Sequence, residues 1–174
     1  MSDVIWHTTM SLDGFIAGPD DDMTWIHGEF PETNALAEEV RDRIGAIVAG
    51  RRWHDLAAER WDGRHGIYGG DWTGPVHVVT HRPPPPDADP GITFVHDGIE
   101  AAVSAAREVA AGKAVGILGA NVARQCLELG LLDEIVVHVA PVLLGAGVRL
   151  HDAPGIEAIR LEGELTDLRY RVPR

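Results

Sequence analysis

The chain has 174 residues, a formal net charge of -12 at pH 7 and a hydrophobic share of 45%. This length suits a single domain, residues 1–174, with a core large enough for helices on both faces of a sheet. The acidic balance argues against nucleic-acid and membrane-surface partners, because both need a positive field. No apolar run reaches the roughly 18 residues of a membrane span, and the N-terminus lacks a secretory pattern, so we expect a cytoplasmic protein.

The first half of the chain alternates apolar segments with an amphipathic one. Residues 4–9, VIWHTT, predict a strand that leads into a polar, glycine-containing loop over residues 11–25. Apolar residues spaced four apart predict a helix over residues 32–44. Residues 46–49, AIVA, predict a short buried strand. Residues 51–75 predict a helix start followed by a loop rich in glycine and tryptophan.

The middle of the chain continues this alternation. Strands are predicted over residues 76–80 and 93–95. The proline run at residues 83–86 must end the first of them, because proline cannot donate to a strand ladder. A helix over residues 99–110 and a strand over residues 114–118 follow.

The C-terminal part of the chain completes the predicted fold. Asn121 is a predicted N-cap of a helix that ends at Gly130, where glycine favours a left-handed cap. Residues 135–140 predict a strand, and alternation over residues 168–172 predicts the last one. We therefore predict an α/β fold, a single domain with a mostly parallel sheet, helices on both faces and an antiparallel C-terminal edge.

Three predicted strand ends carry residues suited to an anionic ligand. In an open parallel sheet, ligands bind beyond the carboxyl ends of the strands, where helix N-termini expose backbone N–H groups. The segments are Gly50-Arg51-Arg52-Trp53, Thr80-His81-Arg82 and Gly119-Ala120-Asn121. Arginine can bind phosphate in bidentate fashion, and small residues let a pyrophosphate approach a helix dipole. Ordinary solvent-facing residues are the alternative at each segment, and the chain lacks both the G-x-G-x-x-G and the P-loop signatures.

Cysteine and histidine residues indicate neither a nucleophile nor a metal site. The single cysteine, Cys126, has apolar neighbours at helical spacing, which predicts a buried, inert thiol. His77 and His81 have H-x-x-x-H spacing, but on a strand such residues lie about 13 Å apart and cannot share a zinc ion. We therefore predict no metal site.

Several motifs together resemble a known family. They are SLDG at residues 11–14, GLLDE at residues 130–134 and PVLLGAG at residues 141–147, with GILGANVARQ starting at Gly116. Their combination resembles the dihydrofolate reductase superfamily, and within it the reductase domain of bacterial riboflavin-pathway deaminase-reductases and its stand-alone relatives. The resemblance covers residues 3–172. It implies a dihydrofolate reductase-like fold, a small-molecule substrate and a homodimer, whereas one cysteine cannot form the P-C-x-x-C of the zinc deaminase half.

The resemblance also implies an NADPH-dependent reductase and assigns cofactor contacts. The expected 2′-phosphate contacts are Arg51, Thr80, His81 and Arg82. The expected contacts along the pyrophosphate side are Gly50, Arg52 and Trp53. The residues expected to line the pyrophosphate and nicotinamide are Leu118, Gly119, Ala120, Asn121 and Val122. Ile16 and Ala17 are expected to approach the nicotinamide. Leu118 stands where the family has the first of two glycines, which leaves Gly119 alone to permit close backbone approach.

Hydride transfer also needs a proton delivered nearby. Asp13 is the first candidate, because its loop follows the first strand, with an Asp-Gly turn residue as the alternative. Glu32 is the second, because dihydrofolate reductases place a substrate carboxylate in the corresponding helix, with a solvated first-turn glutamate as the alternative.

The leading hypothesis is an NADPH-dependent reductase of a small heterocycle of the pteridine or aminopyrimidine type. A reductase of an unrelated carbonyl or imine compound is a rival in the same class. A nucleotide-binding protein without turnover is the rival from another class, favoured by Leu118 and by the unassigned proton donor.

Overall fold

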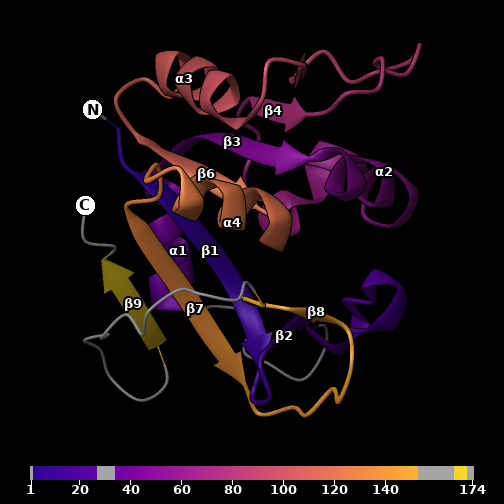
Figure 1. Cartoon of the computed structure of the whole chain (residues 1–174), viewed down its shortest axis with the longest axis vertical. Coiled ribbons are helices and arrows are strands. Elements are labelled where there is room, and N and C mark those ends of the chain that lie inside the picture. Colours follow the sequence, from indigo (N-terminus) through magenta and orange to yellow (C-terminus); the bar gives the residue numbers. More distant parts are fainter. Residues whose placement is uncertain (1, 27–33, 153–166, 172–174) are drawn as a thin grey trace.

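The computed structural model describes residues 2–26, 34–152 and 167–171, and the last segment is described by its backbone only. Within these residues, seven strands form one sheet in the order β5-β4-β3-β6-β1-β7-β9 (Figure 1). The strands are β1 Val4–Ser11, β3 Ile44–Gly50, β4 Val76–Val79, β5 Ile92–Val95, β6 Ala114–Leu118, β7 Glu134–Ala140 and β9 Asp167–Arg171. Neighbouring strands from β5 to β7 are parallel, and β9 pairs antiparallel with β7.

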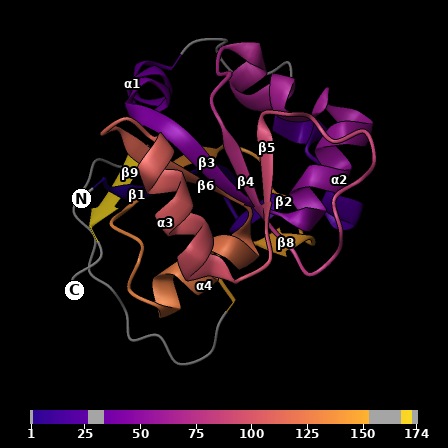
Figure 2. The ribbon, with the colours of Figure 1, turned by 90° about the horizontal axis from the view of Figure 1, so that it is seen from above.

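Helices cover both faces of this sheet (Figure 2). They are α1 Ala35–Arg43, α2 Arg51–Arg60, α3 Ile99–Val109 and α4 Ala120–Glu128, with 3-10 turns η1 Pro19–Asp21, η2 Thr24–Ile26 and η3 Gly63–Gly70. Side chains of α3 and α4 pack with Val4 and Trp6 in one apolar cluster. Val40 of α1 and Ile67 of η3 pack with Ile5 in the other. Strand β1 thus supplies both layers by alternation, and the predicted α/β fold is confirmed.

A second, two-stranded sheet lies beside the first strand. It pairs β2 Phe15–Ala17 with β8 Val148–Arg149 in antiparallel fashion. Residues 11–25 were predicted as a loop, and neither β2 nor β8 was predicted, because strands this short show no alternation. Gly147, with φ of 132°, brings its backbone against Ala17 and Gly18. A Cβ at this position would lie 2.7 Å from the carbonyl carbon of Gly18, so the contact between these segments requires glycine.

Two local predictions were wrong or incomplete. Asn121 is not the N-cap of its helix, because α4 begins at Ala120 with Gly119 as its N-cap. The Asn121 side chain accepts a hydrogen bond from Gln125 instead, at 2.7 Å. Gly130 does adopt a left-handed conformation, with φ of 65°. The helix predicted from residue 32 is described only from Asn34, whose side chain accepts from the N–H groups of Leu36 and Ala37.

Candidate functional site

Two helix N-termini meet at the carboxyl edge of neighbouring strands. Strand β3 leads into α2 through Gly50, and strand β6 leads into α4 through Gly119. Neither N-cap glycine has a side chain to satisfy the first N–H groups of its helix, which are available to an anion. A Cβ on Gly50 would lie 3.3 Å from Cγ2 of Val122, so the two helix starts are in contact. Gly119 has φ of 94°, and a Cβ built on it would meet nothing within 4 Å. A ligand could therefore approach the backbone closely at this position.

Arginine side chains lie beside the first of these helix starts. The Arg51 Nε donates to Asp55 at 2.6 Å, and its Nη1 donates to the carbonyl oxygen of Pro83 at 2.9 Å. The guanidinium carbon lies 5.7 Å from the ring centre of Phe94, and the side chain is only 16% exposed. Arg82, which is 60% exposed, donates through Nη2 to the other oxygen of Asp55 at 2.6 Å. The structure therefore brings Arg51 and Arg82 together around one carboxylate.

Other predicted phosphate contacts have different surroundings. Thr80 is buried, and its hydroxyl oxygen accepts from the backbone N–H of Arg82 at 3.0 Å, so it orients that arginine. His81 is exposed beyond the end of β4. Arg52 is largely exposed and pairs with Asp21 from the loop after β2. Trp53 is partly buried against the core of the α1 face, which is a packing role.

Residues predicted to line the inner part of the site range from buried to exposed. Ile16 and Ala17 lie on β2 and are 8% and 6% exposed. Val122 packs in the core of the α3 and α4 face, whereas Asn121 is exposed in the first turn of α4. Leu118 is partly buried at the end of β6 and packs against the opposite core. Gly119 is the N-cap of α4 and Ala120 is its first residue, so the backbone of these two residues forms the helix start.

Asp13 serves the SLDG loop as a hydrogen-bond acceptor. Its carboxylate accepts from Ser11 Oγ at 2.6 Å and from the N–H groups of Leu144 and Gly145 at 3.0 and 2.7 Å. The hydroxyl of Ser11, followed by these backbone N–H groups, lowers the pKa of Asp13 to about 2. An ionised carboxylate held this way ties the SLDG loop to the PVLLGAG loop. This geometry favours the turn-residue interpretation over a proton donor.

Glu32 lies outside the described residues, and its assignment stays a prediction. The first described residue after it is Asn34, the N-cap of α1. The Asn34 Nδ2 lies 3.4 Å from Nδ1 of His138. The side chain of His138 therefore joins β7 to the start of α1, a contact that no sequence pattern predicted.

A partly buried chain of polar groups lies over β1 and β7. Nε2 of His7 and Nε2 of His138 are 2.7 Å apart, and Nδ1 of His7 is 2.7 Å from the hydroxyl oxygen of Tyr68. His7 comes from β1, His138 from β7 and Tyr68 from η3, so the fold joins segments more than 60 residues apart. Each contact needs one donor and one acceptor, and the chain of Tyr68, His7 and His138 can pass a proton along its length. The only hint in the sequence was a histidine at an inward position of each strand.

Burial sets the protonation states of His7 and Tyr68. Burial, followed by the neighbouring His138, lowers the pKa of His7 from 6.5 to about 3. Burial also raises the pKa of Tyr68 above its usual range. At neutral pH, His7 is an uncharged imidazole and Tyr68 an uncharged phenol.

Unfolding measured against pH tests the state of His7. Its pKa is lower in the folded protein, so the unfolded chain binds a proton that the folded chain does not. The contribution of His7 to the free energy of unfolding is therefore expected to fall as pH drops from about 6.5 towards 3, by at most about 1.4 kcal/mol per pH unit. His7→Gln should flatten this slope in urea titrations. An unaltered slope in His7→Gln would contradict the assignment.

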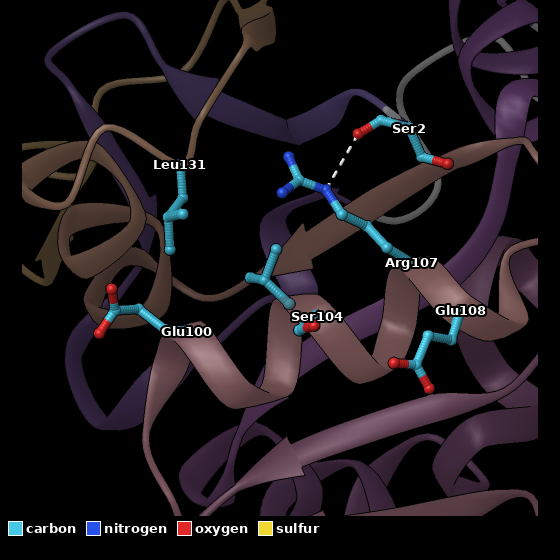
Figure 3. A pocket seen from close by; sticks show the side chains of 7 residues that line it. Ser2, Glu100, Ser104, Arg107, Glu108 and Leu131 are labelled. Carbon is cyan, nitrogen blue, oxygen red and sulfur yellow. Dashed lines mark hydrogen bonds between the residues drawn. The ribbon is translucent and has the colours of Figure 1, made fainter.

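The remaining polar features lie elsewhere. A shallow groove runs along the outer side of α3, where Arg107 donates to the carbonyl oxygen of Ser2 at 3.1 Å (Figure 3). Ser2 and Leu131 precede β1 and β7, so this groove is nearer the amino ends of these strands.

Cys126 is fully buried, and burial raises the pKa of its thiol to about 12, as expected for an inert thiol. Across residues 2–26, 34–152 and 167–171, no three metal-ligating side chains gather and no helix could span a membrane.

Comparison with known families identifies the chain. Residues 2–170 match the model of the RibD C-terminal domain. The chain belongs to the RibD C-terminal domain family. This family is the reductase domain of the RibD enzymes, so the resemblance predicted from SLDG, GLLDE and PVLLGAG is confirmed. No curated protein matches the chain.

Solved structures share the fold of this RibD C-terminal domain protein. A protein from Shewanella sp. PV-4, provisionally assigned to riboflavin biosynthesis, has a TM-score of 0.75 at 22% identity, with 99% of each chain covered. The riboflavin biosynthesis reductase Rib7 of Saccharomyces cerevisiae has a TM-score of 0.64 at 15% identity, with 98% of this chain and 89% of that chain covered. A deaminase/reductase from Thermotoga maritima has a TM-score of 0.59 at 16% identity. The chain covers 56% of that longer protein.

Proposed function

We propose that the protein is an NADPH-dependent reductase of a small aminopyrimidine or related heterocycle. The observation that carries this proposal is the pair of uncapped helix N-termini at Gly50 and Gly119, which meet beside Arg51 and Arg82. Backbone N–H groups at helix starts suit a pyrophosphate, and the arginines suit a further phosphate. Membership of the RibD reductase family supports the reductive chemistry.

The substrate class is proposed from the relatives. The Thermotoga maritima protein is named a 5-amino-6-(5-phosphoribosylamino)uracil reductase. That compound is therefore the first substrate to test, with a pterin and a simple imine as alternatives. NADPH, when bound, would supply the hydride. Oxidation of NADPH with the aminopyrimidine supports the proposal, and turnover with the imine alone would favour the unrelated-reductase rival.

The proton is proposed to come through His138 and His7 rather than from Asp13. Asp13 is ionised and already accepts three hydrogen bonds, so it has no proton to give at neutral pH. His138 lies in the carboxyl half of β7, towards the end of the sheet where both helix starts lie, and it contacts His7 near the middle of β1. In a hydrogen-bonded imidazole pair, one ring can release a proton and then take another from its partner.

Cofactor binding gives the first test of the whole proposal. Calorimetric titration should show NADPH binding to the native protein, whereas no binding of NADPH or NADH would overturn the nucleotide site. Homodimerisation, proposed from the family resemblance, can be checked by light scattering on the same samples.

An Arg82→Ala variant is expected to bind NADPH at least about tenfold more weakly, or about 1.4 kcal/mol, with a much smaller change for NADH. The reason is the loss of an exposed guanidinium, which also leaves Oδ2 of Asp55 without its arginine partner while Oδ1 stays bonded to Arg51. Arg51→Ala should show the same selectivity, but it also removes packing against Phe94. Arg124→Ala, an exposed arginine paired with Glu128 on α4, is the matched control. Equal weakening of both cofactors would contradict the phosphate assignment.

A further inference from the structure

Asp55 sits between the two arginines assigned to the cofactor phosphate. Its Oδ1 accepts from Arg51 Nε at 2.6 Å, and its Oδ2 accepts from Arg82 Nη2 at 2.6 Å. His54 Nδ1 lies 3.0 Å from the same Oδ1. Asp55 is therefore bonded on both oxygens to groups that a phosphate would use.

The carboxylate is held firmly in its charged form. Partial burial by itself opposes ionisation, but hydrogen bonds from Arg51, His54 and Arg82 outweigh it and lower the pKa of Asp55 to about 2. Physiological pH changes therefore do not remove its charge. An incoming phosphate has to share the arginines with this carboxylate or displace it.

Charge balance shows how this affects a phosphorylated cofactor. Arg51 and Arg82 carry two positive charges, and Asp55 removes one of them. A phosphate monoester brings a charge of about -1.5 to -2 at neutral pH. The two arginines alone would compensate it, whereas the cluster with Asp55 compensates only part. The whole chain, with a net charge of -12, adds no positive field to make up the difference.

We propose that Asp55 is a specificity-determining residue that limits the preference of this site for NADPH over NADH. This inference rests on the proposed function, because it concerns the same cofactor site. The carboxylate weakens binding of the 2′-phosphate through competition and repulsion. A free ribose hydroxyl meets no such repulsion and can donate to a carboxylate oxygen. The native protein therefore discriminates between the two cofactors by less than about tenfold.

The position of Asp55 on its helix explains why it acts this way. It is four residues after Arg51 on α2, so the two side chains are neighbours on one helix face. Arg82 reaches the same carboxylate from the segment after β4, where the buried hydroxyl of Thr80 fixes its backbone. One carboxylate thus organises residues from two strand ends.

Calorimetric titration of native protein, Asp55→Asn and Asp55→Glu with NADPH and NADH tests the inference. Asp55→Asn keeps the shape of the side chain and removes its charge. We expect it to bind NADPH at least about tenfold more tightly than native protein, with a change below about threefold for NADH. Asp55→Glu keeps the charge and should retain the low native preference. Glu128→Gln removes the same charge from another arginine pair, with Arg124, and should leave both affinities unchanged.

The outcomes separate failure of this inference from failure of the proposed function. If native protein binds NADPH and Asp55→Asn leaves the ratio of the two affinities unchanged, Asp55 does not set specificity, and the reductase proposal stands. The same holds if Asp55→Glu and Asp55→Asn shift the ratio equally, since charge would then not be the cause. If neither cofactor binds to any of these folded proteins, both proposals fail. Thermal melting of each variant establishes that it is folded.

Discussion

His138→Ala is expected to lower turnover of the aminopyrimidine with NADPH by at least about a hundredfold, the usual contribution of a positioned acid or base. The variant loses the outer imidazole of the chain formed with His7 and Tyr68, through which the proton is proposed to pass. The dissociation constant for NADPH should stay within about twofold of the native value, because β7, which carries His138, is not a neighbour of β3 or β6, whose ends lead into the helix starts at Gly50 and Gly119. Steady-state kinetics and calorimetry measure the two effects separately.

The controls distinguish proton transfer from support of the fold. His138→Gln can still hydrogen-bond His7 but cannot carry a proton, so its turnover should be as low as that of His138→Ala. Added imidazole should partly restore the alanine variant and leave the glutamine variant unchanged. His65→Ala, at a side chain 57% exposed, should turn over normally. Native turnover in His138→Gln would show that the histidine only supports the structure.

Gly147→Ala is expected to lower the free energy of unfolding by about 3 kcal/mol, near the upper end for overpacking at a strained backbone position. The added methyl group would overlap the carbonyl oxygen of Ala17 and lie 2.8 Å from Cα of Gly18. It would push β8 away from β2, which carries Ile16 and Ala17. Urea unfolding monitored by circular dichroism measures the loss, and the variant should also bind NADPH more weakly.

Gly145→Ala provides the matched control for this substitution. Gly145 also has a positive φ, of 73°, but a Cβ there would meet nothing within 4 Å. Only the backbone cost of about 1 kcal/mol is expected at Gly145. Similar losses at Gly145 and Gly147 would mean that backbone conformation, and not contact with Ala17, dominates.

Local patterns were enough for most of the sheet and its helices. Alternation and short apolar runs predicted the main strands, because a residue period reflects which face is buried. The strand β2 and its partner β8 were missed, because two or three residues are too few to show a period. Asn121 was wrongly predicted as an N-cap, because asparagine is a favoured residue at that position. In the structure Gly119 is the N-cap, with a positive φ that glycine adopts readily.

The candidate site was only partly predictable. The strand ends with Gly50, Arg51, Arg82 and Gly119 were found because parallel strands end at the same edge. The partner of both arginines, Asp55, was not singled out, since its role depends on Arg82 arriving from another strand. The contact between His7 and His138 was not predicted for the same reason, because no spacing rule relates residues 131 positions apart in the chain.

The sequence by itself determined the α/β fold, the two-faced sheet and the family, because hydrophobic period, glycine at turns and the SLDG and PVLLGAG motifs are local properties. Only the tertiary structure decided which polar groups meet. It placed the ionised Asp13 where it accepts hydrogen bonds from both the SLDG and PVLLGAG motifs. It also placed Asp55 between Arg51 and Arg82, and His7 in contact with His138. The physical reason is that hydrogen bonds and desolvation act over a few ångströms in space, whatever the separation along the chain.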